Sequence, residues 1–330
     1  MRALGLYEVH VAEEFGIDEL IESGLDRREI RAQLALRSVL SLSPKRFSIP
    51  EAFPVWLADR LRAEGVELAV DQELFDGRRR AKTEAQLAGM RKAQRGAEAA
   101  MDTCRELLRR SEIAGDDLLL DGEQLTVERV KAAMNATFAE HDTTAETYIV
   151  APGAQGATGH DMGSGPIPAG IPLIVDIWPR DNGSSVYTDM TRTFVVGDVP
   201  DRVREWHRLV KEALDRAILE VRAGADARAI FDASCEGFEA AGESTGRTKT
   251  PGEPLVDGFF HGLGHGVGLE VHEPPALGMV SDKTLVAGDV VTIEPGLYRA
   301  GYGGVRLEDI VHVTEDGAEN LTQYSYDLEP

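Results

Sequence analysis

Hydrophobic positions recur with two different spacings along the chain, and the change comes near residue 148. Before it, apolar side chains recur at helical spacing; after it, most of them fall in short runs interrupted by glycine and proline. Helices are expected over residues 26–40, 53–63, 83–110, from 126 onward, 203–221 and 226–241. Because helices and strands are segregated rather than alternating one by one, the pattern predicts an α+β fold.

The 330 residues are enough for about two domains. Residues 1–80 combine two predicted helices with a short β-type run at 66–70, which predicts a small N-terminal α/β domain. The basic run at 78–82 is expected to be an exposed junction. Thr83 and Gln86 then fit a capping box at the start of a long helix, so residues 81–330 are expected to form the second domain.

Acidic residues outnumber basic ones by 57 to 35, for a net charge of −22. Such a surface repels phosphate backbones and anionic lipid headgroups, so no nucleic-acid or membrane partner is expected. The only cysteines, Cys104 and Cys235, are too few for a disulfide framework or a cysteine-rich zinc site. Glu8 and His10 lie where a signal peptide needs an apolar run, which predicts a cytoplasmic protein.

Four carboxylates of the second domain interrupt apolar, strand-like runs: Asp176, Asp189, Glu294 and Glu308. A buried carboxylate is costly unless it is paired, and one divalent cation can hold several. The alternative is that each carboxylate pairs with an arginine, such as Arg192, Arg299 or Arg306. Four such carboxylates in matched positions favour the cation.

Two predicted hairpins bring these carboxylates together. A two-residue turn at Asn182–Gly183 would place Asp176 directly opposite Asp189 on one sheet face. A second hairpin, centred on Gly301, would oppose the two glutamates in the same way. Directly opposed like charges destabilise a sheet, so each pair predicts a positive ion between its members.

Three of the eight histidines, His261, His265 and His272, fall within twelve residues. Glycine alternates with them at positions 262, 264, 266 and 268. This alternation argues against a helix and predicts extended backbone in close packing, with histidines on one face. His160 lies in an earlier glycine-rich loop.

Carboxylates with an imidazole suit Mn²⁺, Co²⁺, Fe²⁺ or Zn²⁺. Neither a His-Glu-x-x-His motif nor a Gly-x-Ser-x-Gly motif or P-loop is present.

These residues resemble the M24-type metallopeptidase family of Xaa-Pro aminopeptidase, prolidase and methionine aminopeptidase, which has the pita-bread fold. The resemblance rests on four runs: Asp189–Phe194, His261–His265 with His272, Ile293–Tyr298 and Arg306–Asp309. It covers about residues 78–320 and implies a catalytic pita-bread domain over residues 81–330.

The resemblance also implies roles for individual residues. Five would be ligands of two divalent ions, Mn²⁺ being expected first: Asp176, Asp189, His265, Glu294 and Glu308. Catalytic or substrate-binding roles are implied for His160, His261, His272, Glu294 as general base, and Arg306. A homodimer is expected from the same resemblance.

The His-x-x-x-His run and the Thr-Arg-Thr-Phe run, behind an N-terminal domain, resemble the proline-cleaving branch most. We therefore expect an Xaa-Pro aminopeptidase acting on peptides with proline at the second position. The alternatives are an Xaa-Pro dipeptidase (prolidase), a non-peptidase C–N hydrolase, or a binding module of the same fold.

The sequence departs from the family's pattern in two places. The segment from Asp176 to Asp189 is about two residues longer than usual in the family and adds Trp178–Arg180 near the site, and the N-terminal domain is short.

Overall fold

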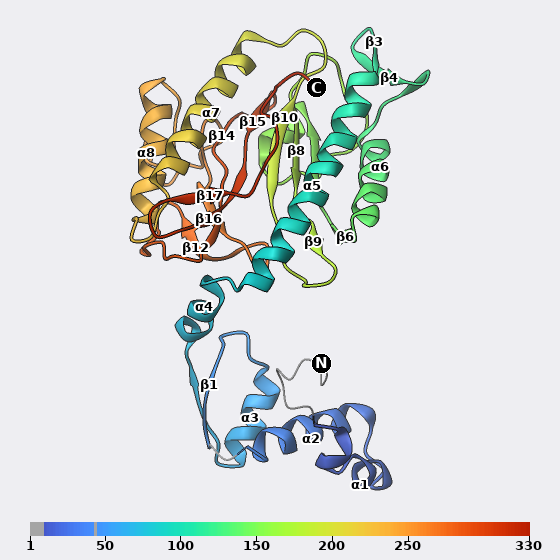
Figure 1. Ribbon diagram of the computed structural model, residues 1–330, viewed down its shortest axis with the longest axis vertical. Coiled ribbons are helices and arrows are strands. Elements are labelled where there is room, and N and C mark those ends of the chain that lie inside the picture. The colour runs from blue at the N-terminus through green and yellow to red at the C-terminus, as the bar shows by residue number, and fades with distance from the viewer. Residues whose placement is uncertain (1–9, 43–44) are drawn as a thin grey trace. The chain divides into compact units, whose positions relative to one another are not determined.

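The chain folds into two compact units, Met1–Arg78 and Arg79–Pro330, in the computed structural model, which describes residues 10–42 and 45–330 (Figure 1). The first unit contains η2 (Ala12–Phe15), α1 (Ile17–Glu22), α2 (Arg27–Leu40), β1 (Arg46–Ile49), α3 (Val55–Ala63), β2 (Glu67–Val70) and most of α4 (Gln72–Arg80). The predicted helices and the strand near residue 66 are present, while α4 replaces part of the expected junction.

The first unit has a small apolar core. Asp26 begins α2 by accepting a hydrogen bond from the Glu29 N–H at 2.9 Å. Leu36, Leu57 and Leu61 then pack between α2 and α3. The strands β1 and β2 pair in parallel beside them. The hydrophobic period of the sequence therefore predicted the helices, and the packing of their apolar faces holds them together.

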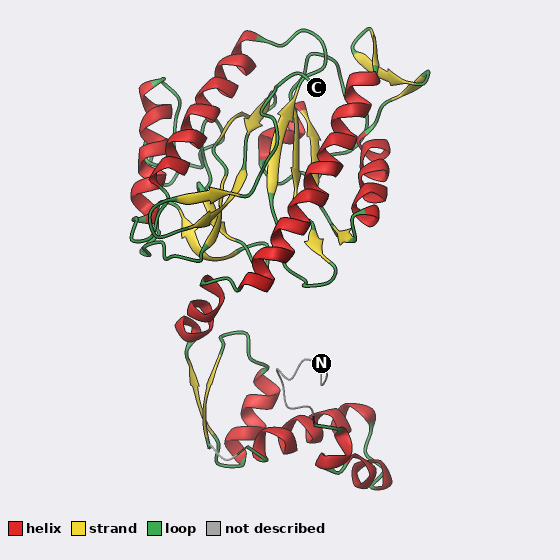
Figure 2. Ribbon diagram, viewed as in Figure 1, coloured by secondary structure: helices red, strands yellow, loops and turns green. Residues whose placement is uncertain are grey.

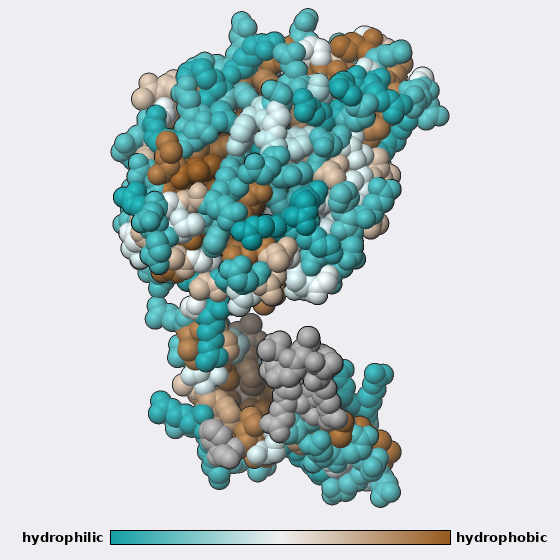
Figure 3. All heavy atoms as spheres, viewed as in Figure 1, coloured by the Kyte–Doolittle hydropathy of each residue, from teal (hydrophilic) through white to brown (hydrophobic). Residues whose placement is uncertain are grey.

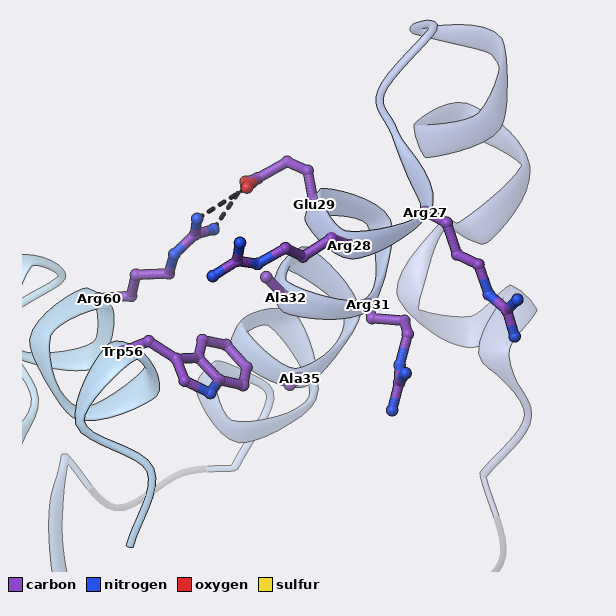
Figure 4. A pocket seen from close by; sticks show the side chains of 8 residues that line it. All are labelled: Arg27, Arg28, Glu29, Arg31, Ala32, Ala35, Trp56 and Arg60. Carbon is purple, nitrogen blue, oxygen red and sulfur yellow. Dashed lines mark hydrogen bonds and ion pairs between the residues drawn. The ribbon is translucent and has the colours of Figure 1, made fainter.

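A cavity of about 750 Å³ lies between α2 and α3 of this unit (Figure 4). Four arginines, Arg27, Arg28, Arg31 and Arg60, line it together with Trp56. Arg60 forms a two-point ion pair with Glu29, at 2.6 and 2.7 Å, which lowers the pKa of Glu29 to about 2. The lining contains no histidine and only one carboxylate, so the predicted metal chemistry does not belong here.

The second unit has two pairs of helices with antiparallel strands between them (Figure 2). Its helices are α5 (Glu84–Arg110), α6 (Val127–Glu140), α7 (Asp201–Glu220), α8 (Ala227–Ala240) and the short η3 (Gly153–Thr158). Its first strands are β3 (Glu112–Ala114), β4 (Asp117–Leu120), β5 (Glu123–Gln124), β6 (Thr143–Thr144), β7 (Ile149–Pro152), β8 (Leu173–Ile177), β9 (Arg180–Asp181) and β10 (Met190–Phe194). Its last are β11 (Gly264–Gly266), β12 (Glu273–Leu277), β13 (Val290–Ile293), β14 (Gly296–Arg299), β15 (Gly303–Arg306), β16 (Asp309–Val313) and β17 (Ala318–Asn320).

Two apolar clusters attach the helices to the strands. One packs α5 and α6 on the sheet of order β10-β8-β7, and includes Cys104, Met134 and Val175. The other packs α7 and α8 on the sheet of order β12-β11-β13-β16-β17, and includes Trp206 and Val311. The long helix α5 begins at the predicted capping box, and Cys104 is fully buried on its apolar stripe, as expected.

Only part of the basic run at residues 78–82 is exposed. Lys82 is buried and donates to Glu273 at 2.5 Å, and Arg80 pairs with Asp289 at 2.5 Å. Arg79 lies 2.9 Å from the other oxygen of Glu273. The expectation of exposure was therefore wrong for Lys82. Arg79 and Arg80 are partly exposed, because acidic groups from far along the chain pair with them, and Arg78 is exposed as expected.

The visible surface is mostly hydrophilic, with hydrophobic residues in scattered groups (Figure 3). Within residues 10–42 and 45–330, no helix combines the length and the apolar character needed to span a membrane.

Candidate metal centre

A cavity of about 390 Å³ in the second unit collects every residue that the sequence marked for chemistry. The five expected metal ligands line it: Asp176, Asp189, His265, Glu294 and Glu308. The four remaining candidates line it as well: His160, His261, His272 and Arg306. These residues are spread over residues 160–308, so the fold and not the local sequence brings them together.

The two aspartates share one sheet face, but not in the predicted register. Asp176 on β8 pairs with Thr191 on β10, and Asp189 lies two positions further along. The turn is wider than predicted because the carboxylate of Asp181 accepts hydrogen bonds from Ser184, while the Asp181 N–H donates to the Val186 carbonyl. Four residues, not two, therefore close the hairpin, and the aspartates become diagonal neighbours rather than an opposed pair.

The two glutamates are opposed as predicted. The ladder between β13 and β16 pairs Ile293 with Asp309, and the hairpin of β14 and β15 pairs Gly296 with Arg306. One continuous register links both ladders and places Glu294 opposite Glu308. Thr191 joins this pair to the first sheet, because its hydroxyl donates to a Glu308 oxygen at 2.7 Å. The four carboxylates thus face one cavity from two sheets.

His265 reaches the cavity because its neighbours are glycines. A Cβ atom on Gly264 would lie 1.9 Å from the Thr292 carbonyl oxygen, and one on Gly266 would lie 2.5 Å from two further carbonyl oxygens. Nδ1 of His265 donates to the Gly266 carbonyl at 3.1 Å. Nε2 then faces Glu294 at 3.5 Å and Asp189 at 3.8 Å with its lone pair, the tautomer that a metal ligand requires.

The charges at this centre fit a divalent cation. Ligand atoms of Asp189, His265 and Glu308 lie within 4.8 Å of one another, and Oδ1 of both Asp176 and Asp189 is buried without a hydrogen-bond partner in the described part of the chain. Burial raises the pKa of Glu294 to about 8, and burial with neighbouring carboxylates raises the pKa values of Asp189 and Glu308 well above normal. Burial lowers the pKa of His265 to about 4. Orphaned carboxylate oxygens beside a neutral imidazole form a donor set that such an ion matches.

A hydrogen-bonded chain runs along the other side of the cavity. Arg306 donates to Asp176 at 2.5 Å and to the Tyr298 hydroxyl at 2.9 Å. Tyr298 in turn donates to Nε2 of His261 at 2.8 Å, and burial lowers the pKa of His261 to about 3. The alternative that each carboxylate pairs with an arginine therefore holds for Asp176, which pairs with Arg306. Arg192 pairs instead with Asp309.

Tyr298 was not predicted as a site residue, although it is fully buried at the centre of this chain. It lies within the Ile293–Tyr298 run, but a phenol carries no charge that would mark it in an apolar strand. His160 and His272 are exposed where they line the cavity, and the His272 ring lies 4.2 Å from that of His265.

Several known proteins are similar to this chain in sequence. The Xaa-Pro dipeptidase of Pyrococcus furiosus is 36% identical over 181 residues, which cover 54% of this chain and 48% of that protein. The probable dipeptidase PepE of Mycobacterium tuberculosis is 33% identical over 194 residues, 58% of this chain and 48% of that protein. The chain thus spans about half the length of the curated relatives it matches.

Solved structures match over a larger share. A prolidase structure from Pyrococcus furiosus superposes with a TM-score of 0.71 at 28% identity, covering 85% of this chain and 76% of that one. An X-Pro aminopeptidase structure from Thermotoga maritima gives 0.75 at 26% identity, covering 90% and 78%. These matches confirm the predicted α+β pita-bread fold. The sequence itself matches metallopeptidase family M24 over residues 88–315, and the chain belongs to that family.

Proposed function

We propose that this protein is a metal-dependent Xaa-Pro dipeptidase, which hydrolyses the bond between the two residues of a dipeptide ending in proline. The observation that carries the proposal is the convergence of four carboxylates and His265 in one cavity. The sequence alone favoured an aminopeptidase acting on longer peptides. The names of the curated relatives, among them Xaa-Pro dipeptidases, favour the dipeptide substrate.

In this proposal five residues hold two divalent cations, with Mn²⁺ expected first: Asp176, Asp189, His265, Glu294 and Glu308. Such ions lower the pKa of water and polarise a carbonyl group. The domain boundary proposed from the sequence, residues 1–80 and 81–330, leaves every one of these ligands in the larger domain.

Glu294 is the residue suited to move a proton. Its carboxyl group lines the cavity beside His265, and burial raises its pKa to about 8. A carboxylate in that position accepts a proton from water and delivers it to the departing proline nitrogen, which cannot leave without one. Glu294 therefore acts as general base and then as general acid.

The histidines bind and orient the substrate. His261 is held by Tyr298 and by its own Nδ1, which donates to the Gly262 carbonyl at 2.7 Å. This fixed ring forms a wall for the proline residue. His272 and His160 line the same cavity and have ring N–H groups that can donate to the negative oxygen formed from the scissile carbonyl.

The test compares Ala-Pro with Ala-Pro-Ala, each with Mn²⁺ and with EDTA, in the wild type and in Asp189→Asn. Cleavage of the dipeptide that needs Mn²⁺, is lost in Asp189→Asn and is at least about tenfold weaker on the tripeptide supports the proposal. Equal or faster release of alanine from the tripeptide would make the protein an aminopeptidase, the candidate that the Thermotoga maritima structure favours. Cleavage of neither peptide by the Mn²⁺-loaded protein would refute both.

A further inference from the structure

Trp178 lines the same cavity as the carboxylates. It follows Asp176 by two residues, directly after β8 ends at Ile177, and both side chains line the cavity. The register that pairs Ile177 with Met190 brings the next position, Trp178, alongside Asp189. On the other neighbouring strand, Ile149 of β7 lies directly opposite Asp176. An indole and an aliphatic side chain therefore flank the two aspartates.

The position of Trp178 is held from several directions. Its partly buried ring packs against the apolar cluster of Ile149, Ala151, Ile174 and Tyr298, and against the cluster under α5 and α6. Just beyond it, the Thr188 N–H donates to the Pro179 carbonyl at 3.0 Å, and β9 pairs with β6. These contacts support the ring as one wall of the cavity.

The charges of the cavity determine which part of a substrate meets this wall. The free amine of a dipeptide is a cation and is attracted to the aspartate side of the cavity. The first residue's side chain leaves the same Cα atom as that amine, so it lies within one residue's reach of Asp176 and Asp189. The groups beside those aspartates are Trp178 and Ile149.

We propose that Trp178 sets the size limit on the first residue of the substrate, admitting small and medium apolar side chains and excluding aromatic ones. This inference rests on the proposed function, because it assumes an Xaa-Pro substrate whose amine faces the aspartates. Trp178 acts by occupying space, so shortening it enlarges the set of substrates. A role in structure alone would instead change the rate on all substrates by the same factor.

The experiment measures kcat/KM of the Mn²⁺-loaded protein on Gly-Pro, Ala-Pro, Leu-Pro and Phe-Pro. The wild type is expected to cleave Phe-Pro about ten- to a hundredfold less well than Ala-Pro. Trp178→Ala should raise kcat/KM on Phe-Pro by about tenfold. Its kcat/KM on Gly-Pro should stay within about threefold of the wild-type value, because glycine has no side chain that could contact the indole ring. Trp178→Phe keeps an aromatic ring in the packing, and its kcat/KM on Phe-Pro should lie between those of the wild type and Trp178→Ala. The matched control is Trp56→Ala, since Trp56 is exposed in the N-terminal unit.

An equal change on all four dipeptides, Gly-Pro included, would overturn the inference, as would a wild type that cleaves Phe-Pro as well as Ala-Pro. If the wild type cleaves no Xaa-Pro dipeptide, the proposed function fails, and calorimetric binding of glycinamide, alaninamide and phenylalaninamide decides about Trp178. Weaker binding of phenylalaninamide than of alaninamide by the wild type, with no such difference in Trp178→Ala, supports the proposed size limit. Equal binding of the three amides by the wild type refutes it.

Discussion

Replacing Lys82 with methionine tests how the start of the larger unit is held. Lys82 and Glu273 form an ion pair at 2.5 Å, and each side chain is only 1% exposed. Removing one partner of a buried pair costs about 3–5 kcal/mol, because the remaining charge stays buried without compensation. Arg79 stays 2.9 Å from Glu273 and is 28% exposed, so it compensates in part. We therefore expect a loss near the lower end, about 3 kcal/mol in the free energy of unfolding.

The measurement is urea unfolding followed by circular dichroism at neutral pH. The double variant Lys82→Met with Glu273→Gln removes both charges and should be more stable than Lys82→Met alone by about 1 kcal/mol or more. The control is Arg91→Met, which breaks an exposed pair with Glu319 and should cost less than about 1 kcal/mol. Equal losses in Lys82→Met and Arg91→Met would refute the view that burial makes this pair important.

Three further predictions concern the metal centre. Glu294→Gln should retain its fold but lose at least about a thousandfold in kcat, because the amide cannot accept the proton; full activity of the Mn²⁺-loaded variant would contradict its assignment as general base. Adding Mn²⁺ at about a hundred times its Kd should stabilise the wild type by about 2.7 kcal/mol, seen as a rise in Tm that EDTA reverses, and Asp189→Asn should show a smaller rise. Gly264→Ala should abolish folding or activity, because its Cβ would lie 1.9 Å from the Thr292 carbonyl oxygen. The control Gly317→Ala places its Cβ in open space and should leave folding and activity unchanged. Unfolding and peptidase assays measure both.

The sequence predicted those parts of the fold that depend on local patterns. The helices follow from apolar spacing, and the opposed pair Glu294 and Glu308 follows from a loop centred on Gly301. Extended backbone around His265 follows from alternating glycines, of which Gly264 and Gly266 leave no room for a Cβ atom against neighbouring backbone. In each case the residues that determine the geometry are close in sequence to those they position.

Errors occurred where a side chain or a distant segment decided the geometry. The Asn182–Gly183 turn failed because the carboxylate of Asp181 binds Ser184 and widens the loop. The expected exposure of Lys82 failed because its partner, Glu273, lies 191 residues away. Tyr298 escaped notice for a different reason, since its importance comes from hydrogen bonds to His261 and Arg306 that only the folded chain forms.

The bond between Thr191 and Glu308 has a consequence for the order of events during synthesis. Together with the pair of Arg192 and Asp309, it joins the two sheets across 117 residues of chain. Contacts of such separation form late, because the intervening chain must first be made and ordered. A nascent chain on the ribosome can therefore build its first sheet and helix pair while the aspartates still lack their glutamate partners. The cluster of Asp189, His265 and Glu308, which could hold a cation, is complete only when the chain as far as Glu308 has emerged.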